Sequence, residues 1–238
     1  MVKKVGTWWI KDGLDDRRVE AQGFGEILDS LSSFDWSEDH GDSNFLEKDF
    51  VETPNYTEKV DLVDIMFQCT HGVYNPDDPS TYGHAFRTWT GDVETTETID
   101  WGKADLDHFS SHACRLLYHS SSNSVGRWIP AFKRLHYMLG FHTPSYSGTN
   151  QRERGSKFAV YAALHLFFPW LFSGYNLRTA WRKANEEVEG SSVQWAYLRA
   201  NGETYSGEWV DTYNEKLLTT EPKDPVKNRS FYTAKGSC

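Results

Sequence analysis

The sequence predicts an α/β fold of three layers, α/β/α, with a mostly parallel sheet in the middle, and three observations point to it. Residues 64–72 and 106–114 begin with short, largely apolar runs bounded by polar turns, which is typical of buried parallel strands. Segments with a helical spacing of apolar residues occur before and after these runs. The 238 residues suit one large domain, which we place at residues 1–218, with a loosely ordered tail at residues 219–238.

The first part of the chain predicts a strand, a helix and an irregular segment. Residues 5–10 are β-branched and aromatic, as in a strand, and residues 19–31 carry apolar side chains at helical spacing. The acidic stretch 32–54 predicts irregular structure. Its pair His40-Gly41 follows no apolar run, so we expect a surface turn there.

The rest of the chain predicts a long loop and then mixed elements. Residues 73–101 are rich in Pro, Asp, Gly, Thr and Tyr, so the crossover between the two apolar runs should be irregular. We expect helices at residues 125–135, 157–172 and 177–188, and strands at residues 136–142, 193–198 and 204–210. Asn201-Gly202 between the last two strands is a strong signal for a C-terminal hairpin.

The composition limits the partners and the compartment. The formal net charge of −9 argues against nucleic acid or an anionic membrane surface as the main partner. Cys69, Cys114 and Cys238 do not make a disulfide framework, and no secretory segment opens the chain. The apolar stretch 158–172 is shorter than a membrane span. We therefore expect a cytoplasmic protein without a cofactor.

A thiol and an imidazole follow the two apolar runs. The first run leads to His71 and the second to Cys114. If the runs are neighbouring parallel strands, both side chains emerge at the carboxyl edge of the sheet, where open α/β sheets bind ligands. A cysteine beside a histidine forms a nucleophile and its base, because the imidazole takes the proton that the thiol must lose. Cys69 lies inside the first strand and is expected to be core.

These two segments resemble the caspase-like cysteine peptidases, the group of caspases, legumains, gingipains and separases. The caspase signature Gln-Ala-Cys-[Arg/Gln/Gly]-Gly has its histidine about 50 residues upstream. Here the segment HACRL occupies residues 112–116, and His71 precedes its cysteine by 43 positions. His112 replaces the glutamine and Leu116 the glycine, so the turn after the thiol differs. The resemblance spans residues 60–141 and looks most like an uncharacterised bacterial branch, for which it implies no substrate.

The resemblance implies a cysteine hydrolase of caspase-hemoglobinase-like fold that acts on an amide bond through an acyl-enzyme. The expected partner is a peptide or a small-molecule acyl substrate. Its oxyanion hole would combine the backbone N–H groups of Gly72 and Cys114. The group that orients the imidazole stays open among three residues, Asp61, Asp77 and Asp78. Substrate-binding side chains are expected at four positions, His112, Arg115, Arg152 and Arg154. For the last two arginines, surface solvation is the alternative to holding a carboxylate.

Other functions fit the same residues. The dyad would also serve an acyl-transferase, a cyclase or a thioesterase-like biosynthetic enzyme, and a binding domain with an inert dyad is a further alternative. His108 and His112 have the i, i+4 spacing of metal ligands on a helix, and Cys69, His71, His84 and His119 are also available. On a strand, however, the two histidines stand about 13 Å apart, and the HExxH glutamate is missing. We therefore expect no catalytic metal.

Overall fold

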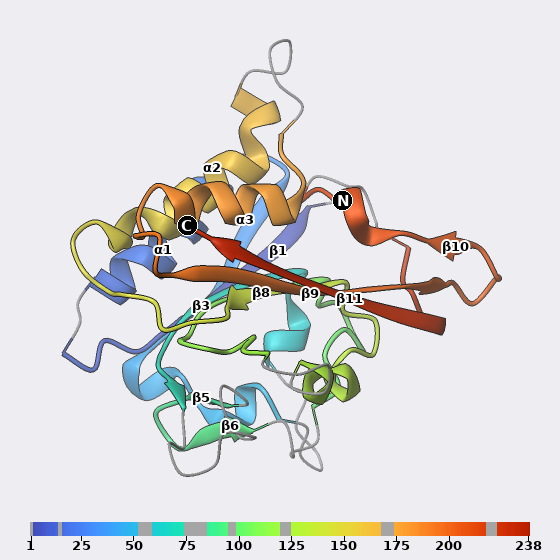
Figure 1. Cartoon of the computed structure of the whole chain (residues 1–238), viewed down its shortest axis with the longest axis horizontal. Coiled ribbons are helices and arrows are strands. Elements are labelled where there is room, and N and C mark those ends of the chain that lie inside the picture. Colours follow the sequence, from blue (N-terminus) through green and yellow to red (C-terminus); the bar gives the residue numbers. More distant parts are fainter. Residues whose placement is uncertain are drawn as a thin grey trace.

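The computed structural model describes residues 2–13, 16–51, 59–73, 85–94, 99–119, 125–167, 174–217 and 223–238. A central sheet crosses the molecule, with three helices gathered on one side and a small second sheet on the other (Figure 1). The mixed α/β class with a largely parallel central sheet, which the sequence predicts, is therefore confirmed.

The central sheet contains eight strands among the described residues. They are β1 (Lys3–Trp9), β2 (Phe34–Gly41), β3 (Ile65–Cys69), β7 (His108–His112), β8 (Tyr137–Phe141), β9 (Gln194–Glu203), β10 (Trp209–Val210) and β11 (Lys227–Ser237). Five run parallel in the order β8, β7, β3, β1, β2, and β9 continues the sheet antiparallel to β8. Strands β3, β7 and β8 are buried along their whole length, as parallel strands covered on both faces should be.

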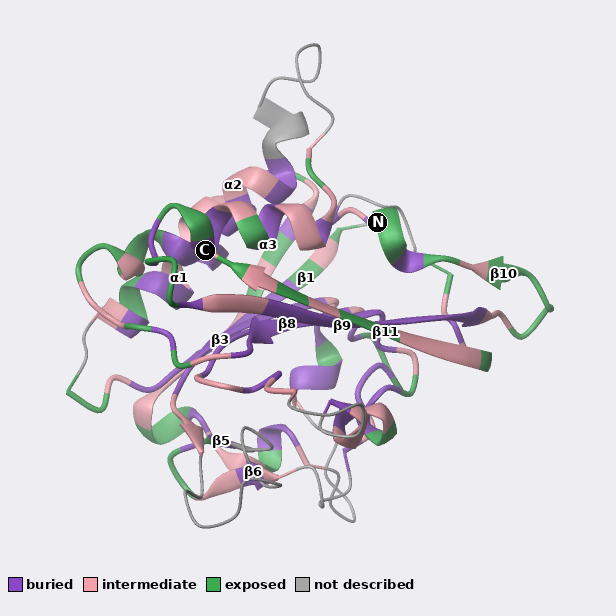
Figure 2. Cartoon of the chain, viewed as in Figure 1, coloured by how far each residue is buried: buried purple, intermediate pink, exposed green. Residues whose placement is uncertain are grey.

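Different layers cover the two faces of the sheet. On one face lie α1 (Asp16–Asp29), α2 (Arg154–Phe167) and α3 (Leu177–Glu186), over a core that includes Phe24, Phe67 and Trp181. On the other face, a second core around Trp101 and Phe109 is covered by short 3₁₀ turns and a small antiparallel sheet. That small sheet consists of β4 (Gly72–Val73), β5 (Ala85–Arg87) and β6 (Asp92–Glu94). Figure 2 shows the buried segments gathered along the central sheet.

None of the helices in the described ranges has the length and apolar character needed to span a bilayer. The crossover from β3 to β7 contains no helix among its described residues, as its composition predicts. A helix was predicted at residues 125–135, but the structure forms the 3₁₀ turn Gly126–Ala131 there instead. Pro130 lies inside this turn, and proline removes the N–H that an α-helix needs.

The predicted surface turn at His40-Gly41 is wrong, because these two residues end β2. This strand pairs in parallel with β1, and the His40 ring stacks on Trp8 with ring centroids 5.2 Å apart. An edge strand is stabilised by its backbone ladder on one side, so it does not need the apolar run that marks a central strand.

The C-terminal region also differs from its prediction. Asn201-Gly202 lies within β9 rather than at a turn, and the Asn201 side chain accepts a hydrogen bond from Thr212 N at 3.0 Å. The chain turns later, at residues 204–208, into the short β10. Where the sequence predicts a loosely ordered tail, β11 pairs with β9 over most of its length. Its polar residues find backbone partners along a strand that is already part of the sheet.

Candidate active site

The strands that precede His71 and Cys114 are parallel neighbours. In the pairing of β3 with β7, Cys69 lies opposite His112, and each candidate residue follows its strand by two positions. The hydrogen bond from Thr70 N to His112 O, 3.0 Å long, continues the pairing beyond the strand ends. The imidazole and the thiol therefore leave the sheet at the same carboxyl edge, where open α/β folds bind ligands.

Gly72 lies directly against the backbone of Cys114. A Cβ at position 72 would overlap the carbonyl oxygen of Cys114 and lie 2.8 Å from its carbonyl carbon and 3.0 Å from its nitrogen. Only glycine fits a backbone approach this close. The N–H of Cys114 donates no hydrogen bond to another described residue, so it is available to a ligand.

The thiol of Cys114 is half-buried and interacts with Ser145, which follows β8. Its Sγ lies 3.4 Å from Ser145 O and 3.4 Å from Ser145 N, and 3.9 Å from the hydroxyl oxygen. Immediately after the thiol, Arg115 has a φ of +58° in the left-handed region. Strain of this kind in a non-glycine residue costs on the order of 1–3 kcal/mol and clusters at functional sites.

His71 is held between a cation and a carboxylate. Arg17 Nη2 lies 3.0 Å from His71 Nδ1, and Asp12 Oδ2 lies 2.9 Å from Nε2 at ion-pair distance but without hydrogen-bond geometry. Because arginine has only donors, Nδ1 must be the acceptor, and the ring proton lies on Nε2. Burial, and then the charge of Arg17, lower the pKa of His71, which keeps the ring neutral near pH 7.

Arg17, in the first turn of α1, is a buried cation with unused donors. The residue is 5% exposed, and its Nε and Nη1 have no hydrogen-bond partner among the described residues. Burial lowers the pKa of Arg17, while the nearby thiols of Cys69 and Cys114 would oppose this shift when ionised. A buried donor without an acceptor costs about 1–3 kcal/mol, and more when it is charged. The unused donors therefore mark a place where a ligand acceptor can bind.

The thiol and the imidazole are not hydrogen-bonded to each other. Within the described part of the chain, the hydrogen-bond partner of Cys114 Sγ is Ser145, and that of the His71 ring is Arg17. Proton transfer from the thiol to Nδ1 of the ring therefore requires that Arg17 first leave that nitrogen.

A buried charge network lies beneath the strand ends. Arg154 donates to Glu20 at 2.9 Å and also to Glu189, and Glu20 Oε2 accepts from His112 Nδ1 at 2.7 Å. Burial, and then the charge of Arg154, lower the pKa of His112 to about 4, so its ring is neutral. Glu189 also accepts from the backbone N–H of Tyr146 at 3.1 Å, which anchors the loop beside the thiol.

The four residues expected to bind substrate lie in different surroundings. His112 and Arg154 are buried in the network just described, where Arg154 holds carboxylates of the protein itself. Arg152 is exposed in the 3₁₀ turn Gln151–Glu153. Arg115 is half-buried next to the thiol, so it is the member of this group that stands closest along the chain to the candidate nucleophile.

Asp61 does not orient the imidazole. Its carboxylate accepts the backbone N–H groups of Gly102, Ala104 and Leu106 and so fixes the approach to β7. The other expected carboxylates and one expected metal ligand, Asp77, Asp78 and His84, lie outside the described residues. The described carboxylate beside the His71 ring is Asp12.

The remaining candidates are separated from the thiol. Cys69 is fully buried, as predicted, and burial raises its pKa well above the usual value. His108 and His112 occupy opposite ends of β7, so they cannot share a metal ion, as expected for a strand. His108 instead faces Glu215, with Nε2 to Oε1 at 2.6 Å.

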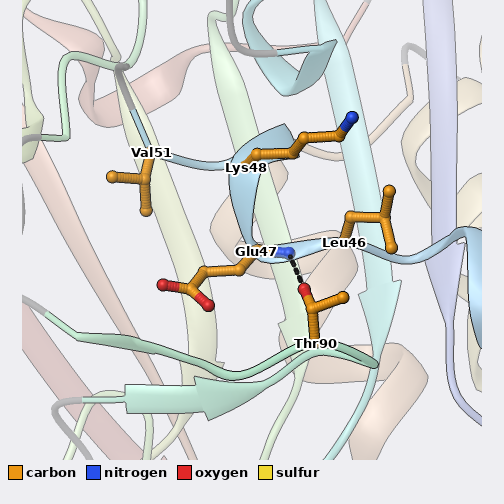
Figure 3. A pocket seen from close by; sticks show the side chains of 5 residues that line it. All are labelled: Leu46, Glu47, Lys48, Val51 and Thr90. Carbon is orange, nitrogen blue, oxygen red and sulfur yellow. Dashed lines mark hydrogen bonds between the residues drawn. The ribbon is translucent and has the colours of Figure 1, made fainter.

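A pocket of about 380 Å³ lies between the 3₁₀ turn Glu47–Asp49 and the hairpin of β5 and β6 (Figure 3). It is lined by Leu46, Glu47, Lys48, Val51 and Thr90. Glu47 N donates to Thr90 Oγ1 at 3.1 Å, which joins the two walls. The lining offers no thiol or imidazole, so the strand edge with Cys114 remains the candidate site.

Three contributors to this site were missed from the sequence: Asp12, Arg17 and Ser145. None of the three ends an apolar run, so the sequence pattern did not mark them as candidates. The signal that identifies them is topological. Each follows a strand next to the two that carry His71 and Cys114, and loops after neighbouring parallel strands meet at one edge.

Comparison with known proteins gives a family but no activity. No curated protein matches the chain. One family model, described as a domain of unknown function, matches residues 2–235 and so includes every residue of the site just described. The protein therefore belongs to the DUF6345 family.

Proposed function

We propose that the protein is a caspase-like cysteine hydrolase that cleaves an amide bond, with Cys114 as nucleophile and His71 as the group that moves protons. The observation that carries this proposal is the contact of Gly72 with the backbone of Cys114, which holds the two strand ends together at a ligand-binding edge. The left-handed backbone of Arg115, directly after the thiol, supports it.

In the proposed reaction, the thiol of Cys114 gives its proton to His71 Nδ1, and the sulfur attacks the substrate carbonyl carbon. The N–H groups of Cys114 and Gly72 stabilise the negative oxygen that forms. The C–N bond then breaks, the leaving amine takes the proton from the imidazole, and the acyl group stays on the sulfur as a thioester. Water, deprotonated by His71, attacks this thioester and releases the acid and the free thiol.

Arg17 indicates the charge of the substrate. Arg17 Nη2 donates a hydrogen bond to His71 Nδ1, the ring nitrogen that must accept the thiol proton. The other two guanidinium nitrogens, Nε and Nη1, have no acceptor among the described residues. An acidic group near the scissile bond would bind these donors as a charge-assisted pair and compete with His71 for the guanidinium. We therefore infer a substrate with a carboxylate close to the amide that is cleaved.

A binding domain with an inert dyad is the second candidate, and one observation favours it. No hydrogen bond joins Cys114 to His71, because the thiol interacts with Ser145 and the ring with Arg17. If the contact between Arg17 and the ring persists with ligand bound, the domain holds an anionic segment without cleaving it.

A library of fluorogenic peptide amides, with acidic, neutral or basic residues before the cleaved bond, distinguishes the two candidates. We expect cleavage after acidic residues by the wild type, none by Cys114→Ala, and full cleavage by the control Cys238→Ala. His71→Ala should lower the rate by roughly 10²–10⁴-fold. Binding of acidic peptides that depends on Arg17, without cleavage of any library member, would contradict the hydrolase and support the binding domain.

A further inference from the structure

Two histidines and a glutamate converge at the amino ends of β7 and β8, on the opposite edge of the sheet from Cys114. His108 Nε2 lies 2.6 Å and His136 Nδ1 2.9 Å from Glu215 Oε1. The ligand atoms of these three residues all lie within 4.8 Å of one another. His108, His136 and Glu215 are 1%, 0% and 9% exposed, so the cluster is interior.

The carboxylate of this cluster is balanced differently from its neighbours. The neighbouring carboxylates have cations of their own: Asp107 lies 3.6 Å from Lys3 Nζ, and Asp224 lies 3.4 Å from Arg134 Nη1. Among the described residues, the ion-pair partners of the buried Glu215 carboxylate are the two imidazoles, and no lysine or arginine contacts it. Buried charges persist only when they are paired or bind a metal, so the cluster takes up either one proton or one metal ion.

The donor set and its surroundings fit zinc. Two histidines and one glutamate form the protein ligands of a known class of zinc sites, with water in the fourth position. His136 Nε2, the ring nitrogen that faces away from Glu215, lies 3.5 Å from Asp224 Oδ1. This is an ion-pair distance without hydrogen-bond geometry, and a small movement would let the carboxylate accept the ring N–H and orient a metal-binding imidazole. Ligand atoms around tetrahedral zinc lie about 3.3 Å apart, so the side chains must move outward by about half an ångström.

A second buried cluster of possible metal ligands, a glutamate, a cysteine and a histidine, provides a contrast. The ligand atoms of Glu20, Cys69 and His112 also lie within 4.8 Å of one another. There, however, Arg154 donates to Glu20 at 2.9 Å and supplies the positive charge from within the protein. In the described part of the chain no guanidinium contacts the Glu215 carboxylate, which favours this cluster as the place for a metal ion.

We propose that His108, His136 and Glu215 bind one zinc ion, which ties the segment that carries Glu215 to the amino ends of β7 and β8. Glu215 lies 79 positions after His136, so no local motif in the sequence indicates the site. The role is structural, because the site and the candidate nucleophile lie at opposite edges of the sheet.

The zinc content of the full-length chain tests this without any measurement of activity. The protein is stripped with a chelator and reloaded with zinc, and its metal content and Tm are measured; cobalt is then substituted for a visible spectrum. We expect one zinc per chain, a higher Tm with zinc than after stripping, and the cobalt spectrum of a tetrahedral site. Wild-type protein that retains no zinc after reloading, with an unchanged Tm, would overturn the proposal, because the cluster then holds a proton.

Glu215→Gln and the matched variant Glu20→Gln locate the ion. Each removes one buried carboxylate charge and keeps the size of the side chain. We expect Glu215→Gln to lose zinc and Glu20→Gln to keep it, whereas the reverse result would overturn the assignment. If either variant fails to fold, the cobalt spectrum of the wild type still shows which of the two clusters holds the metal ion. A thiolate ligand from Cys69 gives a charge-transfer band that a site of two histidines and a glutamate lacks.

Discussion

Gly72 packs against the carbonyl group of Cys114 so closely that no side chain fits at position 72. The contact joins the loops that leave β3 and β7, and it sets the distance between the candidate base and the candidate nucleophile. In the proposed site, the reacting groups are therefore positioned by main chain rather than by a hydrogen bond between the two side chains.

Gly72→Ala is expected to push the two strand ends apart. The added methyl group overlaps backbone atoms, which cannot rotate away, so the free energy of unfolding should fall by about 1–3 kcal/mol. Alkylation of Cys114 should slow in the same variant. Chemical denaturation and peptide mass spectrometry measure the two effects. Gly190→Ala is the control, because a Cβ there meets nothing within 4 Å, and equal losses in both variants would refute the role of the contact.

Arg17→Met is expected to raise the pKa of His71. Burial is the larger cause of the low pKa, and the positive charge of Arg17 is the next, so its removal should shift the titration of the ring upward. NMR of the imidazole C–H signals follows this titration directly. Arg18→Met removes the same charge from the exposed neighbouring position and should leave the midpoint unchanged. No difference between the two variants would mean that the guanidinium does not contact the ring in solution.

Arg115→Gly should be more stable than Arg115→Ala. Both variants lose the same charged side chain, but only glycine adopts a φ of +58° without strain. We expect a difference of about 1 kcal/mol in the free energy of unfolding, measured by chemical denaturation. Equal stability of the two variants would show that the turn after Cys114 is not strained.

The stability of the protein should fall as the pH drops from about 6.5 towards 4, in part because of His112. Its pKa is lowered to about 4 in the folded state, by burial first and then by the charge of Arg154. In this range the unfolded chain binds a proton at His112 and the folded chain does not, so acid favours unfolding. Above about pH 6.5 neither state binds this proton, and His112 no longer makes the unfolding free energy depend on pH.

His112→Gln tests this dependence. Glutamine can still donate to Glu20 but does not titrate, so the slope of the unfolding free energy against pH should become flatter between about 6.5 and 4. His40→Gln, at a histidine outside the buried network, is the comparison. A slope that is unchanged in His112→Gln would show that the ring does not stay neutral in the folded protein.

The central strands could be predicted from the sequence, and the edge strands could not. Ile65–Cys69 is buried on both faces, and burial of that kind requires an apolar run that is visible in the residues. β11 takes much of its stability from backbone pairing with β9, and its polar side chains therefore gave no signal. The hairpin signal at Asn201-Gly202 failed because the Asn201 side chain is used to hold Thr212.

The candidate site was predictable only in part, for a similar reason. His71 and Cys114 end apolar runs, so their places at the strand ends follow from the pattern itself. Asp12 and Arg17 contribute because β1 lies beside β3, although β2 and its connections separate the two strands in the chain. Such neighbours are set by the order of strands in the sheet, which local residue patterns do not encode.

Alkylation by iodoacetate and by iodoacetamide, followed at Cys114 and Cys238 of the same molecule, tests the central claim most directly. The two reagents share one reactive centre, and only iodoacetate carries the carboxylate that Arg17 would bind. Cys238 is an internal reference, a half-buried thiol whose pKa burial raises to about 11. We predict that Cys114 reacts faster than Cys238, prefers iodoacetate, and slows in His71→Ala. Equal rates at the two cysteines, unchanged in His71→Ala, would contradict an activated thiol at Cys114.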